Sequence, residues 1–293
     1  MSTLLCLGLG YCARYYVAEF GARFERLVGT SRAPKPAGAV EMLAFDGSAP
    51  SDALRAAVAT ATHLLISAGP GEAGDPILAS LANAIGSAPK LEAIVYLSSL
   101  GVYGDHGGAW VDETAATIPA HERGGARLRA EQAWQALGKK RNTPAAVLRL
   151  AGIYGPGQNA FTRLMAGRAH RVAKPGHVFN RIHVSDIAQA IDAALTRKAD
   201  GIFNVTDDEP AAYSDQVVLA ARLLGVEPPK ELSMEDARQT LTAFALSFYS
   251  GCVRVRNDKL KRGLGVQLRY PTYREGLRAL FDEGYEARDP LSR

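Results

Sequence analysis

Short apolar runs alternate with amphipathic stretches over the first two-thirds of the chain. Several of these runs are almost uninterrupted, as in strands that are covered on both faces. The predicted strands are residues 3–7, 26–30, 40–45, 63–67, 91–98, 145–150 and 202–205. Helical periods lie between them at residues 11–21, 52–59, 75–87, 123–137 and 185–196. This alternation predicts an α/β fold with a doubly wound parallel sheet.

The pattern changes after Val205, where helical periods continue with little strand signal. The predicted helices are residues 214–224, 233–248 and 273–281, separated by proline-rich segments. We therefore expect a sheet domain formed by residues 1–155 and 180–206. Residues 156–179 and 207–293 are expected to form a small, mainly helical substrate-binding lobe.

A glycine motif joins the first predicted strand to the first predicted helix. Gly8, Gly10 and Ala13 form the pattern G-x-G-x-x-A, with Tyr11 and Cys12 inside it. The first glycine permits a tight turn, the second lets backbone approach a diphosphate, and the small third residue lets helix and strand pack closely. The helix N-terminus then offers free amides to the phosphates. The motif, in this strand–helix context, predicts a Rossmann-type domain that binds a nicotinamide dinucleotide.

The end of the second predicted strand indicates which nucleotide is preferred. An acidic side chain there would bind the ribose 2′-hydroxyl of NAD. The chain instead has Ser31 and Arg32, a hydroxyl and a guanidinium that suit a 2′-phosphate. We therefore predict NADP over NAD, with a solvated loop charge as the alternative interpretation of Arg32.

Two further strand ends are expected to line the cofactor. Asp46 and Gly47 follow the third strand, where Asp46 would accept a hydrogen bond from adenine or else cap a turn. The fourth strand ends at Ser67, Ala68 and Gly69, whose small side chains would let backbone lie close to the cofactor. Cys12 stands near a helix N-terminus, where a thiol pKa can fall, but a packing role is favoured.

Four further segments, together with residues 8–13, resemble the extended (atypical) short-chain dehydrogenase/reductase superfamily in its NAD-dependent epimerase/dehydratase branch. They are residues 96–104 (YLSSLGVYG), 149–157 (RLAGIYGPG), 181–188 (RIHVSDIA) and 203–210 (FNVTDDEP). The resemblance implies that Ser99 binds the reacting carbonyl or alcohol, and that Gly152 and Ile153 contact the nicotinamide amide. For His183 and Asp186 a structural role is favoured.

The chain departs from the superfamily at its Tyr-x-x-x-Lys motif. Arg123 and Arg127 stand at these two positions. Arg127 can still donate to ribose hydroxyls, but a guanidinium stays protonated and Arg123 cannot act as a general base. A non-standard proton relay is therefore expected. The candidates to supply it are Tyr103, Tyr154, His106, His121 and Glu122.

Arg123 and Arg127 lie four residues apart and therefore share a helix face. Two interpretations remain open: a clamp for an anionic substrate group, or a solvated ladder of charges completed by Glu131. The basic segment 159–174 is expected to overlie the nicotinamide end, or else to be a solvated loop. A nucleotide-sugar-like or other small anionic substrate would suit these charges.

Composition narrows the class of protein. The 293 residues are 47% hydrophobic and 22% charged with a net charge of +4. The basic residues are scattered, which disfavours a nucleic-acid binder.

Without a run of about 18 apolar residues, no membrane span is expected. Three cysteines without metal-ligand spacing predict reduced thiols, a cytoplasmic location and no metal site. A homodimer through helices 75–87 and 123–137 is permitted.

Two functions follow. The first is an NADP-dependent oxidoreductase of the epimerase/dehydratase type with a rearranged proton relay. The second is a non-catalytic NADP-binding sensor or regulatory protein. Retention of Ser99 favours the enzyme, and the missing tyrosine favours the sensor.

Overall fold

A seven-stranded parallel sheet forms the centre of the computed structural model, which describes residues 1–292 and, at Phe244, the backbone alone. Its strand order is β3-β2-β1-β4-β5-β7-β11, and every neighbouring pair is parallel. The strands are β1 (Thr3–Leu7), β2 (Arg26–Ser31), β3 (Glu41–Ala44), β4 (His63–Ile66), β5 (Ala93–Ser99), β7 (Ala145–Leu150) and β11 (Gly201–Val205). The predicted Rossmann-type sheet is confirmed.

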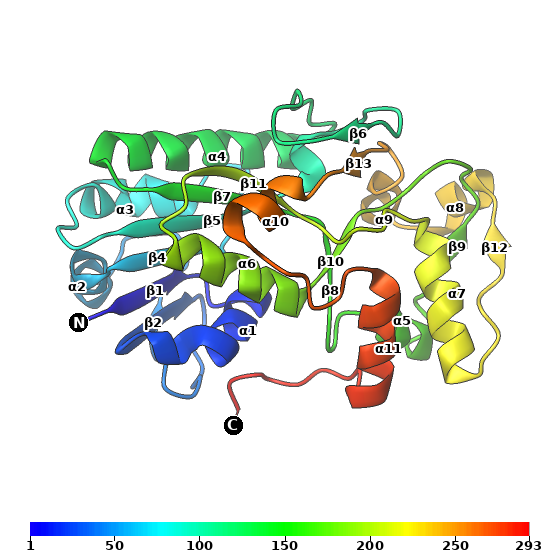
Figure 1. Ribbon diagram of the computed structural model, residues 1–293, viewed down its shortest axis with the longest axis horizontal. Coiled ribbons are helices and arrows are strands. Elements are labelled where there is room, and N and C mark those ends of the chain that lie inside the picture. The colour runs from blue at the N-terminus through cyan, green and yellow to red at the C-terminus, as the bar shows by residue number, and fades with distance from the viewer. Residues whose placement is uncertain (293) are drawn as a thin grey trace.

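Helices cover both faces of this sheet (Figure 1). One face carries α1 (Tyr11–Phe20), α6 (Val184–Thr196) and α10 (Asp258–Leu264); the other carries α2 (Asp52–Thr60), α3 (Pro76–Gly86) and α4 (Glu122–Arg141). Each face has its own buried apolar cluster. The strand order reverses between β1 and β4, which opens a crevice at the carboxyl ends of these strands.

The remaining elements gather at one end of the molecule (Figure 1). The helices are α5 (Ala160–Met165), α7 (Tyr213–Leu224), α8 (Met234–Thr240), α9 (Ala243–Ser247) and α11 (Tyr273–Glu283), with two short 3-10 turns, η1 (Gly21–Arg23) and η2 (Leu100–Val102), in the sheet domain. Three parallel pairs join β8 (Gly152–Tyr154) to β10 (Arg181–His183), β9 (Arg171–Val172) to β12 (Glu231–Leu232), and β6 (Trp110–Val111) to β13 (Arg254–Val255).

The prediction of one helix over residues 233–248 is wrong. The structure has two shorter helices there, α8 and α9. The backbone is extended at Leu241 (φ −92°, ψ 151°), and the Thr242 hydroxyl accepts a hydrogen bond from the Ala245 amide at 3.2 Å. Threonine is a good N-cap residue, so it starts a new helix where the apolar period alone would continue the old one.

A buried ion pair fixes α4 to the sheet. Glu131 on α4 and Arg149 on β7 are 1% and 3% exposed, and their side chains approach to 2.8 Å. Glu131 also accepts a hydrogen bond from the hydroxyl of Ser98 on β5. The Arg149 guanidinium lies 4.8 Å from the ring centre of Tyr103, so the charge is enclosed by partners from three elements.

The segment after α11 returns to the first helix, as the last stretch of ribbon in Figure 1 shows. The Tyr285 carbonyl accepts hydrogen bonds from the Gly157 amide (2.9 Å) and the Asn159 side chain (2.7 Å). Further on, Asp289 forms an ion pair with Arg14 of α1. This segment therefore connects the chain before α5 to the helix that follows the glycine turn.

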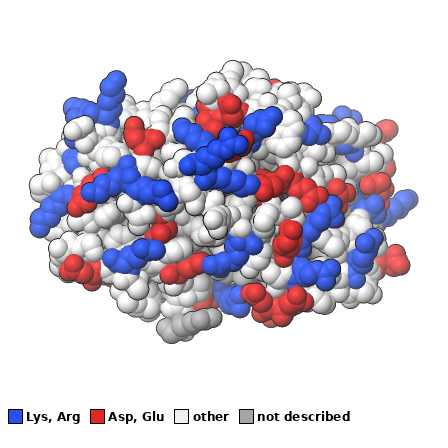
Figure 2. Space-filling view, in the orientation of Figure 1, with Lys and Arg blue, Asp and Glu red and all other residues white. Residues whose placement is uncertain are grey.

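Basic and acidic side chains are intermixed over the face shown in Figure 2. Within residues 1–292, none of the helices has the length and apolar character needed to cross a bilayer. The large apolar side chains of α3 and α4, including Ile77, Leu81 and Trp134, lie in the core. Dimerisation through these helices stays a prediction.

Breaking the buried pair should be costly. In Glu131→Gln, the Arg149 guanidinium remains buried without a counter-charge, and we expect the free energy of unfolding to fall by about 3 to 5 kcal/mol. Urea denaturation would measure it. The control is Glu41→Gln, because Glu41 pairs with Arg26 at 2.7 Å on the surface and should contribute less than about 1 kcal/mol. Equal losses in the two variants would contradict this prediction.

Candidate functional site

A glycine turn connects β1 to α1 at the crevice. Gly8 has φ +92°, and a Cβ atom there would lie 2.7 Å from the Ala68 amide nitrogen, so only glycine fits. Its amide donates to the Thr30 hydroxyl at 2.8 Å, and the Leu9 amide donates to the Thr30 carbonyl at 2.7 Å. The turn is thereby held against the end of β2.

The N-terminus of α1 offers free amides. Gly10 is the N-cap residue and has no side chain to cap the helix, and the first return bond runs from the Arg14 amide to the Gly10 carbonyl. The amides of Tyr11, Cys12 and Ala13 have no acceptor among the described residues. A Cβ atom at Gly10 would meet only the Ser67 hydroxyl, at 3.8 Å. This uncapped turn with open space before it fits a diphosphate.

Cys12 has a packing role. Its thiol is buried in the cluster beneath α1, and burial raises the pKa of Cys12 to about 12. The thiol therefore stays protonated at neutral pH, so the favoured interpretation is confirmed. What Cys12 presents to the crevice is its backbone amide.

The end of β2 carries the residues expected to read the adenosine ribose. Arg32 is exposed, and within the described part of the chain it makes no hydrogen bond or ion pair. The Ser31 hydroxyl is buried without a hydrogen-bond partner there. Asp46 instead accepts a hydrogen bond from the Ser48 amide at 2.9 Å, and its contacts with Ser48 hold the Asp46 pKa below its usual value. The turn-capping alternative accounts for this carboxylate.

Arg127 lies across the ends of β4 and β5. Its guanidinium donates to the Leu97 carbonyl at 2.8 Å and to the Tyr96 hydroxyl at 3.4 Å. A Cβ atom at Gly69 would lie 2.5 Å from Nη2 of Arg127, so the glycine makes room for the arginine. Because Glu131 pairs with Arg149 inside the protein, the interpretation of a solvated ladder completed by Glu131 is wrong.

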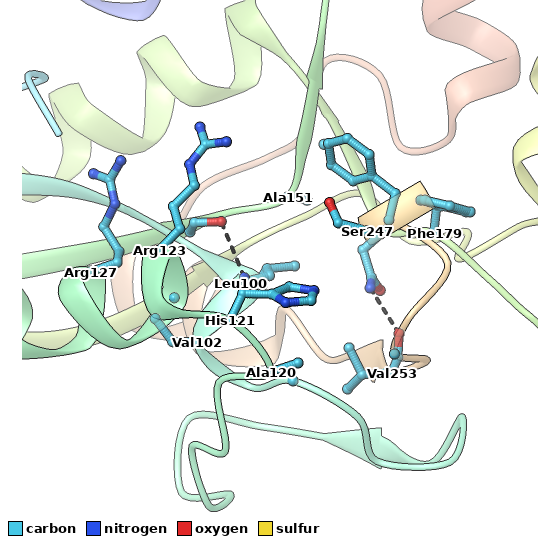
Figure 3. Close-up of a pocket in the computed structure, with 18 of the residues that line it drawn as sticks. Leu100, Val102, Ala120, His121, Arg123, Arg127, Ala151, Phe179, Ser247 and Val253 are labelled. Carbon is cyan, nitrogen blue, oxygen red and sulfur yellow. Dashed lines mark hydrogen bonds between the residues drawn. The ribbon is translucent and has the colours of Figure 1, made fainter. Parts of the chain in front are cut away.

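A cavity of about 480 Å³ lies beside these residues (Figure 3). It brings together Ser99, Arg123, Arg127, Gly152 and Ile153, which lie far apart in the sequence. Arg123 and Arg127 extend from α4 on the same side of the cavity. The Ser99 hydroxyl accepts a hydrogen bond from the Gly101 amide at 3.1 Å, which leaves its own proton free to donate.

Most of the other lining is apolar. Leu100, Leu150, Phe179 and Val253 contribute to the walls. Phe179 and Val253 lie opposite Arg123 in Figure 3, and the adjoining chain from Ser247 to Val253 closes that side. No motif or hydrophobic period predicted this segment, because it begins at the end of residues 233–248, which were predicted as one continuous helix.

One of the five candidates for the proton relay lines this cavity, namely His121. Tyr103 is buried, with its hydroxyl 2.8 Å from the Asn204 side chain. Tyr154 is also buried, and its hydroxyl faces Gly276. The two remaining candidates bind elsewhere: the His106 ring contacts the Ala116 carbonyl at 3.1 Å, and Glu122 pairs with Arg129.

His183 and Asp186 hold the backbone around α6. Nδ1 of His183 accepts the Ser185 amide at 3.2 Å, and burial lowers the His183 pKa to about 3. The Asp186 carboxyl accepts the amides of Arg269 (2.5 Å) and Tyr270 (3.2 Å), while burial raises its pKa to about 6. These contacts agree with the favoured structural role.

No residue of the basic segment 159–174 is among the described residues that line the 480 Å³ cavity, and its expected place over the nicotinamide end stays a prediction. Asn159 caps α5, and Arg163 lies over the ring of Tyr213. Lys174 donates to the Tyr249 carbonyl and lines a second cavity of about 320 Å³. Asn159 and Lys174 are therefore held by backbone contacts, whereas Arg163 and Arg168 between them are exposed, as the solvated-loop alternative expects.

Comparisons with known proteins match part of the chain to a family and almost the whole chain to solved structures. The model of the NAD dependent epimerase/dehydratase family matches residues 73–206. A 3-diazoavenalumate denitrifying reductase of Streptomyces sp is 32% identical over 137 residues, which are 45% of this chain and 45% of that protein. The chain thus matches about half the length of this curated relative.

Two solved structures cover almost the whole chain. A functionally unknown conserved protein from Silicibacter pomeroyi DSS is 44% identical, with a TM-score of 0.86 over 97% of this chain and 99% of that one. MoeE5, in complex with UDP-glucose and NAD, shares the fold at 21% identity and a TM-score of 0.77, over 96% and 98% of the two chains. The family match covers residues 73–206, a little under half of the chain, and it lies in the same fold as the glycine turn and the free amides.

Proposed function

We propose that the protein is an NADP-dependent oxidoreductase of the epimerase/dehydratase type that acts on a small anionic substrate through a non-standard proton relay. The observation that carries this proposal is that the free amides of α1 and the cavity beside Ser99 lie at strand ends of the same sheet. The free amides of Tyr11–Ala13 lie at the crevice, Ser99 and two arginines line the cavity, and Arg127 of that cavity lies against Gly69 at the end of β4. Residues 156–179 and 207–293 would form the substrate-binding lobe.

The cofactor would be held by the chain's backbone and by Arg127. The amides of α1 receive the diphosphate, and Gly152 and Ile153 approach the nicotinamide amide. Arg127 takes the place of the usual lysine, with donors besides the Nη1 that binds the Leu97 carbonyl available for ribose hydroxyls. The bound nicotinamide supplies hydride transfer.

NADP is preferred because Ser31 and Arg32 suit a 2′-phosphate. Arg32 is exposed at the end of β2, and no carboxylate of the chain binds it within residues 1–292. A guanidinium can bind a phosphate through two parallel hydrogen bonds. Arg32 directly follows the last residue of β2. The Asp46 carboxylate is bound to Ser48 instead.

The substrate side combines a charged clamp with apolar walls. Arg123 and Arg127 would bind a carboxylate or phosphate, while Leu100, Leu150 and Phe179 surround an apolar body. The similarity to a protein named a 3-diazoavenalumate denitrifying reductase supports reduction of an acid anion. A nucleotide sugar, as bound by MoeE5, is the broader alternative within the same class of anions.

A non-catalytic NADP-binding sensor is the second candidate. Arg123 at the tyrosine position favours it, because a guanidinium cannot exchange the substrate proton. The cavity beside Ser99 favours the enzyme, because a sensor of the nucleotide alone has no need of a second, largely apolar chamber.

Two glycines in one turn should respond differently to the same substitution. A Cβ atom in Gly10→Ala would meet only the Ser67 hydroxyl, at 3.8 Å, so we expect stability within about 0.5 kcal/mol of the original. Because this Cβ would occupy the diphosphate position, the Kd of NADP should rise at least about tenfold, or about 1.4 kcal/mol. Gly8→Ala forces a positive φ and should lower the free energy of unfolding by about 1 to 3 kcal/mol. Calorimetry with NADP and urea denaturation measure both. Unchanged NADP affinity in Gly10→Ala would contradict the diphosphate site.

Arg32 should set the choice between the two nucleotides. In Arg32→Ala the 2′-phosphate loses a charge-assisted contact of about 1.5 to 3 kcal/mol, so the Kd of NADP should rise about 10- to 100-fold while that of NAD stays constant. Lys35→Ala is the matched control, since Lys35 is an exposed basic residue of the same loop. An unchanged ratio of the two dissociation constants would contradict this assignment.

Arg123 should discriminate an anion from a neutral analogue. With the NADP-loaded protein, Arg123→Ala should weaken benzoate about 10-fold or more and leave benzamide unchanged, because only benzoate carries the charge. The control is Arg129→Ala on the same helix outside the cavity. If calorimetry finds equal losses for both probes, the clamp is wrong.

A further inference from the structure

His121 occupies a position that no family motif assigns. It is the N-cap residue of α4 and comes two residues before the place of the missing tyrosine. Its ring points into the cavity from the side that carries Arg123 (Figure 3). Among the described residues that line the cavity, His121 is the one whose side chain type ordinarily gains and loses a proton near neutral pH.

The hydrogen bonds around His121 define which ring nitrogen carries the proton. The Ser250 hydroxyl donates its single proton to the Ser247 carbonyl at 2.7 Å. It can therefore only accept from Nε2 of His121, which lies 3.0 Å away. Nε2 is the protonated nitrogen of the neutral ring, and Nδ1 keeps its lone pair. Nδ1 makes no cap hydrogen bond to α4.

We propose that Nδ1 of His121 exchanges the proton with the substrate in place of the missing tyrosine, and that Ser250 is the positioning residue that fixes this tautomer. The proposal rests on the proposed function, because it requires a substrate beside a bound nicotinamide. The proposal identifies Nδ1 of His121 as the atom that accepts and donates the proton in the non-standard relay.

Oxidation of a substrate alcohol would move one proton to His121 and one hydride to the nicotinamide. In the oxidative direction the O–H bond of a substrate alcohol breaks and its proton passes to Nδ1. The C–H electron pair would leave the substrate carbon with its hydrogen, as the hydride that a bound oxidised nicotinamide would accept, and the carbon–oxygen double bond would form. Ser99 donates a hydrogen bond to that oxygen. His121 is exposed, so the proton on its ring can pass to solvent; in the reductive direction each transfer reverses.

The surroundings of His121 carry charges of both signs. On its own helix Glu122 pairs with Arg129, and two arginines line the same cavity. From the packed loops, the Asp105 carboxyl accepts the Cys252 amide at 2.9 Å, and the His177 ring contacts the Gly251 carbonyl at 2.8 Å. The charged or titratable groups on these elements include Glu122, Arg123, Arg127, Arg129, Asp105, Lys174 and His177. Variants must therefore be compared at each pH.

The tautomer is measurable without any substrate. In ¹⁵N-labelled protein, long-range ¹H–¹⁵N NMR should show Nε2 of His121 as protonated and Nδ1 as unprotonated in the neutral ring, with His121→Gln assigning the signals. In Ser250→Ala this preference should weaken, whereas a purely structural serine would leave it unchanged. A wild-type ring protonated at Nδ1 would overturn the proposal.

The position beside the nicotinamide is tested by binding alone. Protonated His121 should repel the cationic ring of NADP⁺ but not the neutral ring of NADPH. The ratio of the NADP⁺ to the NADPH dissociation constant should therefore rise about 3- to 10-fold as the pH falls from about 8 to about 5.5. This rise should vanish in His121→Gln and persist in His106→Gln, whose histidine lies outside the cavity.

The assignment to His121 and the proposed function can be overturned separately. If both nucleotides bind and His121→Gln keeps the pH dependence of the ratio, the assignment to His121 is overturned and the proposed function stands. If neither nucleotide binds to the wild-type protein at any pH, the proposed function is overturned and the relay with it.

Discussion

The ion pair between Glu131 and Arg149 holds together the part of the molecule on which the cavity depends. It joins the middle of α4 to β7, and the Ser98 hydroxyl adds β5. Two charges removed from water are tolerated only when each is well paired. One turn further toward the N-terminus, Arg127 is thereby held over the ends of β4 and β5. Ser99, the neighbour of Ser98, shares that fixed edge.

Much of the fold could be predicted because the central strands are covered on both faces. Such strands give uninterrupted apolar runs, and their observed bounds differ from the predicted ones by no more than two residues. The strands of two or three residues outside the sheet are too short to produce any period. At residues 233–248 the apolar spacing passes through Thr242, so the break depends on a capping hydroxyl that hydrophobic periodicity does not reveal.

In the site, too, the features that depend on neighbouring residues could be predicted, and those that depend on distant contacts could not. The glycine turn and its free amides depend on neighbouring residues, and the motif alone indicated them. Arg127 against Gly69 and His121 against Ser250 depend on tertiary packing. Ser250 is 129 residues from its partner, and no spacing rule connects such pairs. For the same reason the sequence could not choose among the five candidates for the proton relay. The structure distinguishes them, because only His121 among the five lines the cavity.

The returning segment after α11 has a consequence for how the molecule can move. Tyr285 is bound to Gly157 and Asn159, while Asp289 is bound to Arg14 on α1. A movement of α5 and the chain before it away from the sheet would therefore pull on the helix whose amino end faces the crevice. The two regions would be mechanically coupled, and a protease cut near Gly284 would uncouple them while leaving every strand of the sheet intact.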